Sequence, residues 1–125
     1  MTRVLIVEDE PLVARMYEKA LAFDNFEVEL AMGGENGVAK TRDWKPDIVL
    51  MDIMMPGMNG IEALEKIKTD PEIQNIPIVM LTNLSGENDM DLAKEKGAID
   101  YWVKKDIKPK EMGKKINKIL QPSSL

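Results

Sequence analysis

Residues 3–11 read RVLIVEDEP, a short apolar run that ends in three acids and a proline. Such a run is typical of a buried β-strand, and proline suits the first turn of the helix that would follow. Three further apolar runs occupy residues 48–51, 76–81 and 99–103, each followed by a longer stretch with helical spacing. This alternation predicts a parallel β-sheet with crossover helices.

A weaker pattern adds a fifth strand, and the apolar spacing defines the helices. Residues 26–30 alternate apolar and acidic side chains, as an edge strand with one solvated face does. The helical stripes are Leu12, Val13, Met16, Tyr17, Ala20 and Leu21 after Pro11, then residues 35–43, then Ile61, Leu64 and Ile67 after Gly60, then residues 90–96, and finally Met112, Ile116, Ile119 and Leu120 after Pro109. We therefore expect an α/β fold with a doubly wound, five-stranded parallel sheet.

The length and composition suit one compact domain, since the chain has 125 residues of which 44% are hydrophobic. We expect this domain to span residues 1–121, with residues 122–125 as a C-terminal tail.

The formal net charge of -5 gives no reason to expect direct binding of nucleic acid. The absence of cysteine and histidine argues against thiolate metal sites and histidine-based catalysis. No apolar run is long enough for a signal sequence or a membrane span, so we expect a cytoplasmic protein.

Polar side chains directly follow four of the predicted strands. They are Glu8 and Asp9 after the first strand, Asp52 after the third, Thr82 after the fourth and Lys104 after the fifth. In an open parallel sheet these strand ends lie along one edge, where such folds bind ligands. The sequence therefore predicts that these side chains form one polar site.

The chemistry of this site indicates phosphate transfer with a divalent ion. Carboxylates within a few ångströms repel one another by roughly 4 kcal/mol per close pair near a protein surface, so three of them need a cation or a raised pKa. With only oxygen donors available, Mg²⁺ is favoured over softer metals. Lys104 and Thr82 would bind oxygens of an incoming phosphoryl group, and a carboxylate such as Asp52 can be the in-line nucleophile.

Several motifs together resemble the receiver domains of response regulators, in order and spacing and over essentially the whole chain. They are Glu8-Asp9, Asp52, Met55-Pro56-Gly57-Met58-Asn59-Gly60, Thr82, Gly97-Ala98 and Tyr101-Trp102-Val103-Lys104. The resemblance implies a flavodoxin-like (βα)5 fold. It also implies phosphorelay signalling, in which Asp52 accepts a phosphoryl group from a histidine kinase or a histidine phosphotransfer protein.

The same resemblance implies a set of metal ligands. Asp9 would bind Mg²⁺ directly and Glu8 through water, Asp52 would be a further ligand, and the backbone carbonyl of Met54 would complete the protein ligands. Aspartate is commoner than glutamate at the position of Glu8. The longer side chain can still hold a metal-bound water, so we expect the function to be retained.

The resemblance also implies a switch, and it draws attention to two unusual residues. Thr82 would move toward the phosphoryl group and Tyr101 would turn inward behind it, which rearranges a face that protein partners recognise in a phosphorylation-dependent way. Lys105 stands where the family usually has proline, often after a cis bond. A cis bond between Lys104 and Lys105 would cost about 3 kcal/mol, so the sequence leaves the isomer open. Asn83 is larger than the usual alanine or serine.

Two other functions fit the same fold. An aspartate-nucleophile phosphatase usually carries a second carboxylate two residues after the nucleophile, where this chain has Met54. An FMN carrier of the flavodoxin type would need a loop rich in Ser, Thr and Gly after the first strand, and the acids at residues 8–10 would repel its phosphate. We therefore expect a phosphoacceptor switch with at most self-phosphorylation and self-dephosphorylation activity. The kinase, the downstream partner and the oligomeric state stay open, as does the choice between a solvated face and a docking surface for the C-terminal lysines.

Overall fold

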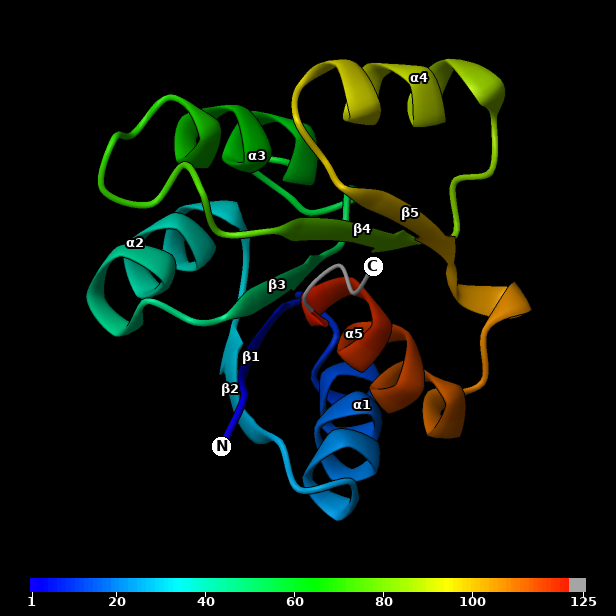
Figure 1. Ribbon diagram of the computed structural model, residues 1–125. Coiled ribbons are helices and arrows are strands. Elements are labelled where there is room, and N and C mark those ends of the chain that lie inside the picture. The colour runs from blue at the N-terminus through cyan, green and yellow to red at the C-terminus, as the bar shows by residue number, and fades with distance from the viewer. Residues whose placement is uncertain (122–125) are drawn as a thin grey trace.

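A parallel β-sheet forms the centre of the molecule in a computed structural model that describes residues 1–121 (Figure 1). Its strands are β1 (Arg3–Val7), β2 (Glu27–Ala31), β3 (Ile48–Met51), β4 (Ile78–Thr82) and β5 (Asp100–Val103). They lie in the order β2-β1-β3-β4-β5, and every neighbouring pair is parallel. The chain runs outward in both directions from β1, so the ends of β1 and β3 mark the place where such sheets bind ligands.

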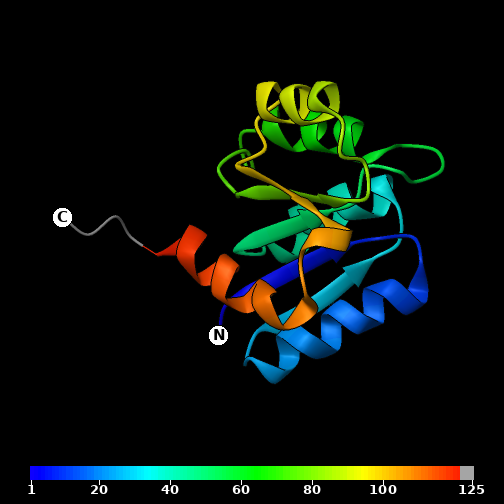
Figure 2. The same ribbon diagram turned by 90° about the vertical axis from the view of Figure 1, so that its right-hand side faces the viewer.

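Helices cover both faces of this sheet (Figure 2). They are α1 (Pro11–Phe23), α2 (Gly34–Trp44), α3 (Gly60–Lys68), α4 (Glu87–Glu95) and α5 (Met112–Leu120). α1 and α5 lie against one face, and α2, α3 and α4 lie against the other (Figure 1). Two 3-10 turns, Lys104–Asp106 and Pro109–Glu111, connect β5 to α5. The predicted doubly wound α/β fold is confirmed, and the predicted tail at residues 122–125 lies outside the described residues.

The hydrophobic core has two layers, one on each side of the sheet. Along β1, Val4 and Ile6 pack with α1 and α5, whereas Leu5 and Val7 pack with the helices on the other face. All four side chains are at most 1% exposed. Because a central parallel strand is buried on both faces, its sequence is a continuous apolar run. The edge strand β2 is only partly buried, which explains its alternating pattern.

The apolar stripe predicted for α1 is partly wrong. Leu12 is 86% exposed and Met16 is 47% exposed, whereas the buried residues of this helix are Ala14, Tyr17 and Leu21. At about 100° per residue, Leu12 and Met16 each lie about 200° around the helix from Ala14 and so face away from the sheet. In α5, Met112 and Ile116 are buried as predicted, but Ile119 and Leu120 in the last turn are only half-buried.

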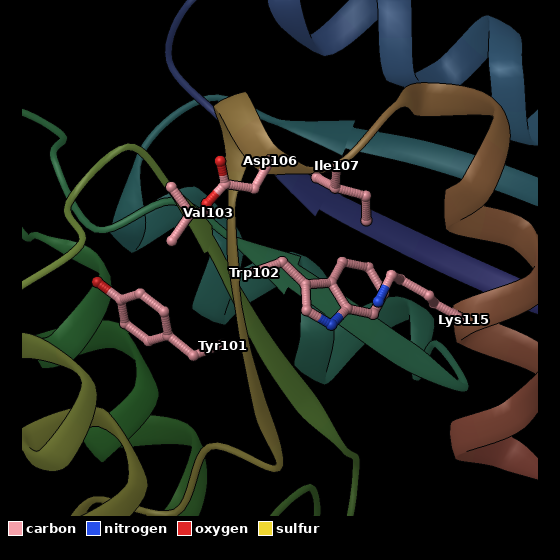
Figure 3. A pocket seen from close by; sticks show the side chains of 6 residues that line it. All are labelled: Tyr101, Trp102, Val103, Asp106, Ile107 and Lys115. Atoms are coloured by element: carbon pink, nitrogen blue, oxygen red, sulfur yellow. The ribbon is translucent and has the colours of Figure 1, made fainter.

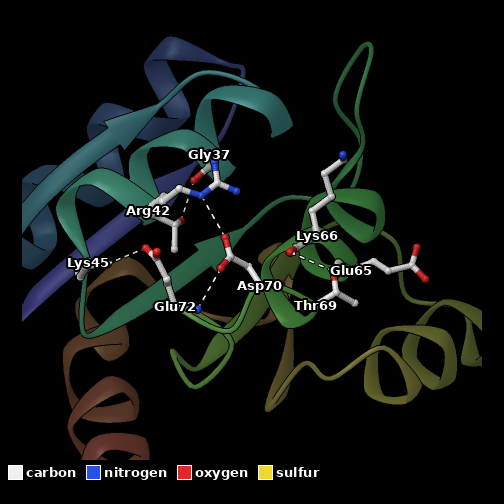
Figure 4. Close-up of polar contacts among 9 residues, drawn as sticks. Gly37, Arg42, Lys45, Glu65, Lys66, Thr69, Asp70 and Glu72 are labelled. Atoms are coloured by element: carbon white, nitrogen blue, oxygen red, sulfur yellow. Dashed lines mark hydrogen bonds and ion pairs between the residues drawn. The ribbon is translucent and has the colours of Figure 1, made fainter.

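Ion pairs fasten the end of α2 to the turn after α3 (Figure 4). Arg42 Nε lies 3.0 Å from Asp70 Oδ2, and Lys45 Nζ lies 3.7 Å from Glu72 Oε2. The backbone N–H of Glu72 also donates to Asp70 Oδ1 at 2.9 Å. The Asp70 carboxylate therefore binds both the Arg42 side chain of α2 and the backbone of the turn after α3.

Within residues 1–121, no helix is both long enough and apolar enough to cross a bilayer.

Candidate active site at the carboxyl edge of the sheet

Three carboxylates meet where β1 and β3 end. Glu8 and Asp9 follow β1, and Asp52 follows β3, which pairs with β1 so that Val7 is opposite Met51. One carboxylate oxygen from each of the three acids lies within 4.8 Å of the other two. Glu8 and Asp52 are only 2% and 6% exposed. So many buried negative charges need a positive partner, and the oxygen-only donor set fits a hard divalent cation.

Lys104 supplies one positive charge from the end of β5. Its Nζ donates to Glu8 Oε1 at 2.5 Å and to Asp52 Oδ2 at 3.1 Å. Burial alone would lower the pKa of Lys104, but the hydrogen bond to Glu8 and the charges of Asp52 and Glu8 together raise that pKa above its ordinary value. Lys104 is therefore protonated at neutral pH. For Glu8, burial and the charge of Asp52 raise the pKa, and the hydrogen bond from Lys104 opposes this rise.

Thr82 and Tyr101 approach the site from β4 and β5. Thr82 is 1% exposed and pairs in register with Val103, which precedes Lys104. Its hydroxyl oxygen accepts a long hydrogen bond, 3.4 Å, from the backbone N–H of Leu84. The hydroxyl of Tyr101 donates to the carbonyl oxygen of the same Leu84 at 2.6 Å. Burial raises the pKa of Tyr101, and the charges of Asp89 and Asp52 add to this rise.

The loop between β3 and α3 is fixed by local hydrogen bonds. Asn59 accepts from the backbone N–H of Glu62, and Glu62 accepts in return from the backbone N–H of Asn59, which is a capping box at the start of α3. Gly60 packs directly on the backbone of Asp52, so that a Cβ at this position would collide with the Asp52 carbonyl oxygen. The side chain of Met54 is 63% exposed. The role of its carbonyl as a metal ligand stays a prediction.

The unusual residues beside the site have ordinary backbone geometry. No cis peptide bond occurs within residues 1–121, so the bond between Lys104 and Lys105 is trans. Lys104 begins a 3-10 turn directly after β5, and Lys105 is exposed. Asn83 is exposed as well. Neither Lys105 nor Asn83 is buried beside the carboxylates.

Tyr101 and Trp102 point to opposite faces of the sheet, as their adjacent positions on β5 predict (Figure 3). Trp102 is buried, and its Nε1–H donates to Asp100 Oδ2 at 2.9 Å. Lys115 Nζ lies 5.8 Å from the centre of the Trp102 ring, within cation–π range. A hollow of about 220 Å³ opens beside them, lined by Tyr101, Trp102, Val103, Asp106, Ile107 and Lys115. Trp102 is thus a natural fluorescent reporter for changes in β5 and α5.

Tyr17 is a buried residue of α1 that the charges of the candidate site influence. It is 3% exposed on α1, and burial raises its pKa, on which the charges of Lys104, Glu8 and Asp52 also act. In the sequence Tyr17 is one member of an apolar stripe. No local pattern distinguishes it from a residue of the core, so its nearness to the charged site emerges only from the fold.

The fold and the site together define a class of protein. A (βα)5 sheet whose carboxyl edge gathers acids, a threonine and a lysine offers ligands for a cation and donors for phosphoryl oxygens. The family model described as the response regulator receiver domain matches residues 4–117, and the chain belongs to this family. It is thus a receiver domain of the kind found in two-component response regulators, and the predicted family is confirmed. Such domains bind Mg²⁺ at an acidic pocket, and here Glu8, Asp9 and Asp52 could hold a metal ion.

Individual relatives agree with this assignment. Protein PilH of Pseudomonas aeruginosa is 38% identical over 120 residues, which cover 96% of this chain and 98% of PilH. Response regulator PleD of Caulobacter vibrioides is 39% identical over 102 residues, 82% of this chain but only 22% of PleD. The DNA-binding response regulator MtrA of Mycolicibacterium smegmatis is 39% identical over 88% of this chain and 46% of MtrA. The chain thus spans less than half the length of PleD and MtrA.

Solved structures show the same fold. Chemotaxis protein CheY4 of Vibrio cholerae superimposes with a TM-score of 0.88 at 28% identity, over 95% of this chain and 98% of CheY4. The BeF3-activated N-terminal receiver domain of Klebsiella pneumoniae RstA also gives a TM-score of 0.88 at 28% identity, over 96% of this chain and 99% of that chain. The predicted flavodoxin-like sheet is therefore confirmed by proteins of the same family.

Proposed function

We propose that this chain is a phosphorylation-controlled switch in which Asp52 accepts a phosphoryl group from a phosphohistidine. The donor would be a histidine kinase or a histidine phosphotransfer protein. One observation carries the proposal: the Asp52 carboxylate lies 3.1 Å from Lys104 Nζ and within 4.8 Å of oxygens from Glu8 and Asp9. A nucleophilic carboxylate, a cation and further oxygen ligands for a metal are the parts that phosphoryl transfer needs.

The residues that would hold Mg²⁺ are Asp9 and Asp52 directly, Glu8 through water, and the carbonyl of Met54. All of them offer oxygen, which suits a hard cation. The ion would neutralise charge on the transferring phosphoryl group, which is the chemistry that a bound metal supplies here. The buried carboxylates themselves support this assignment, because their mutual repulsion is offset by a divalent charge.

The chain's own residues then perform the transfer. A carboxylate oxygen of Asp52 attacks phosphorus in line, forming the new P–O bond as the P–N bond to the donor histidine breaks. The ammonium of Lys104 binds one phosphoryl oxygen and the hydroxyl of Thr82 binds another, so that charge on the transferring group is spread over fixed donors. Lys104 already lies beside the nucleophile and needs little movement.

Phosphorylation would reach the surface through Leu84. Thr82 accepts a hydrogen bond from the N–H of Leu84, and Tyr101 donates to its carbonyl. A shift of Thr82 toward the phosphoryl group therefore acts on the same residue that holds the Tyr101 ring. The result is a population shift between two packings of α4, β5 and α5, whose outer face a protein partner would recognise.

This role is that of a switch with at most self-phosphorylation and self-dephosphorylation activity. Met54 stands two residues after Asp52, where a phosphatase of the aspartyl-phosphate type would place a general acid, and the chain has no histidine. The proposed domain spans residues 1–121. A cytoplasmic location follows from the proposed donor, and the net charge of -5 argues against direct contact with nucleic acid.

The test is exposure to acetyl phosphate, or to beryllofluoride as a mimic, in the presence of Mg²⁺. We expect shifts in the amide NMR spectrum and a change in tryptophan fluorescence, and we expect Asp52→Asn to give neither. Asp43→Asn is the matched control, because Asp43 is an exposed acid on α2 and should respond like the unmodified chain. An equal response from Asp52→Asn would refute the proposal.

A further inference from the structure

The closest charged partner of Lys104 is Glu8 rather than Asp52. Lys104 Nζ lies 2.5 Å from Glu8 Oε1 and 3.1 Å from Asp52 Oδ2. The side chains of Glu8 and Lys104 are 2% and 13% exposed, so water screens this pair very little. A buried and hydrogen-bonded pair of this kind fixes the geometry of both side chains.

Both oxygens of the Glu8 carboxylate already have protein donors. Oε1 accepts from Lys104, and Oε2 accepts from the backbone N–H of Glu10 at 3.2 Å. The carboxylate is thereby held at both ends, one to the turn before α1 and one to the end of β5. Its orientation suits a counter-ion for Lys104, with lone pairs left for a metal-bound water.

The pairing depends on glutamate at this position. An aspartate carboxylate would sit one methylene, about 1.5 Å, closer to the backbone. From a contact of 2.5 Å, that retreat would take the oxygen out of hydrogen-bond range of Lys104. The length of Glu8 is therefore what allows it to reach the end of β5.

We propose that Glu8 is a positioning residue for Lys104. Glu8 holds the Lys104 ammonium beside Asp52 before any phosphoryl group arrives, and the pair stays intact when a divalent ion binds at Asp9 and Asp52. Lysine has one of the most mobile side chains, so holding it in advance removes an ordering cost from phosphoryl binding. This consequence for transfer depends on the proposed function, whereas the pairing itself does not.

The direct test observes the ¹H–¹⁵N signal of the Lys104 ammonium by NMR in the full 125-residue chain, without metal or phosphoryl donor. Lys104→Arg identifies the signal. We expect it to be protected from exchange with water in the unmodified chain and in Glu8→Gln, which keeps the reach and an oxygen acceptor. Glu8→Asp keeps the charge but not the reach, so its signal should be lost. Unchanged protection in Glu8→Asp overturns the proposal.

Titration of the unmodified chain with Mg²⁺ gives a second test that needs no variant. The Lys104 signal should persist at saturation, while amide signals around Asp9 and Asp52 shift. Loss of the Lys104 signal in step with metal binding would show that Glu8 leaves Lys104 for the ion, and would overturn the proposal. Because no phosphoryl donor is present, this outcome is independent of whether Asp52 is phosphorylated.

Metal affinity separates the two acids that follow β1, Glu8 and Asp9. Asp9→Asn should raise the Kd for Mg²⁺ by about tenfold or more, whereas Glu8→Asp should change it by less than about threefold. Glu10→Gln is the control, because Glu10 is an exposed acid next to the site whose N–H, not its side chain, contacts Glu8. Equal losses of affinity in Asp9→Asn and Glu8→Asp would contradict the assignment of Glu8 to Lys104.

Discussion

The hydroxyl of Tyr101 donates a hydrogen bond of 2.6 Å to the carbonyl oxygen of Leu84. The N–H of Leu84 in turn donates to the hydroxyl oxygen of Thr82. Both backbone groups of one residue are thus held by the two side chains to which a switching role is proposed. Leu84 lies in the loop between β4 and α4 and is hydrogen-bonded to both side chains. A displacement of Thr82 would therefore act on Tyr101 through two hydrogen bonds to one residue.

Removal of the Tyr101 hydroxyl tests this connection. Tyr101→Phe should lower the free energy of unfolding by about 1 kcal/mol, the usual net value of one hydrogen bond, and should speed amide exchange in the loop after β4. Urea unfolding and hydrogen exchange measure the two effects. Tyr101→Ala should cost more, because the ring also packs against the core on the α3 side. Identical stability of Tyr101→Phe and the unmodified chain would mean that the hydrogen bond is not formed in solution.

The apolar side chain of Met54 predicts a long-lived aspartyl phosphate. It stands two residues after Asp52, is 63% exposed and offers no general base to activate water. Met54→Asn should speed loss of phosphate by about threefold or more, which is about 0.7 kcal/mol of barrier, because the amide can orient an attacking water. The measurement is the decay of phosphoprotein after the donor is removed. Met54→Leu keeps an apolar side chain and should lose phosphate at the rate of the unmodified chain. Equal rates of phosphate loss in the unmodified chain, Met54→Asn and Met54→Leu would contradict a role for the apolar side chain.

The position of the site could be predicted from the sequence because the parallel topology determines which residues lie at the carboxyl edge of the sheet. Once Val7, Met51, Leu81 and Val103 are taken as strand ends, the residues after them must share one edge of the sheet. The two-sided burial of β1, β3 and β4 made those strands continuous apolar runs, which are easy to find.

The contacts within the site could not be predicted in the same way. Glu8 and Lys104 are 96 residues apart and Tyr101 and Leu84 are 17 apart, so their pairing depends on side-chain length and loop geometry rather than on local pattern. The exposed Leu12 and Met16 show a related limit. The apolar spacing placed them in one stripe with Tyr17, whereas the direction of their side chains around the helix leaves them exposed.

Gly60 should be intolerant of any side chain. Its Cβ would collide with the carbonyl oxygen of Asp52 and would lie 2.8 Å from the Cα of Ile53, both of which are backbone atoms that cannot easily move. Gly60→Ala should lower the free energy of unfolding by about 1–3 kcal/mol and slow phosphorylation of the displaced Asp52. Gly86→Ala is the control, because its φ of -72° is ordinary and the nearest atom is a flexible carboxylate oxygen of Asp89 at 3.3 Å. Its cost should stay below about 1 kcal/mol. A Gly60→Ala protein as stable as Gly86→Ala would contradict the close packing.

Asp70 should give the chain a stability component that is lost in acid. A hydrogen bond from the N–H of Glu72 and the pairing with Arg42 lower the pKa of Asp70 below its ordinary value of 3.8 (Figure 4). A carboxyl with a lowered pKa in the folded state stabilises the fold at pH values above 3.8, and this contribution disappears as the pH falls through the folded pKa. Asp70→Asn should therefore have a lower Tm than the unmodified chain at pH 7, and the two Tm values should converge as the pH falls below 3.8. Thermal unfolding followed by circular dichroism measures this, with Asp43→Asn as the control for replacing an exposed acid on α2. A Tm difference that stays constant across the acidic range would show that Asp70 acts through something other than its charge.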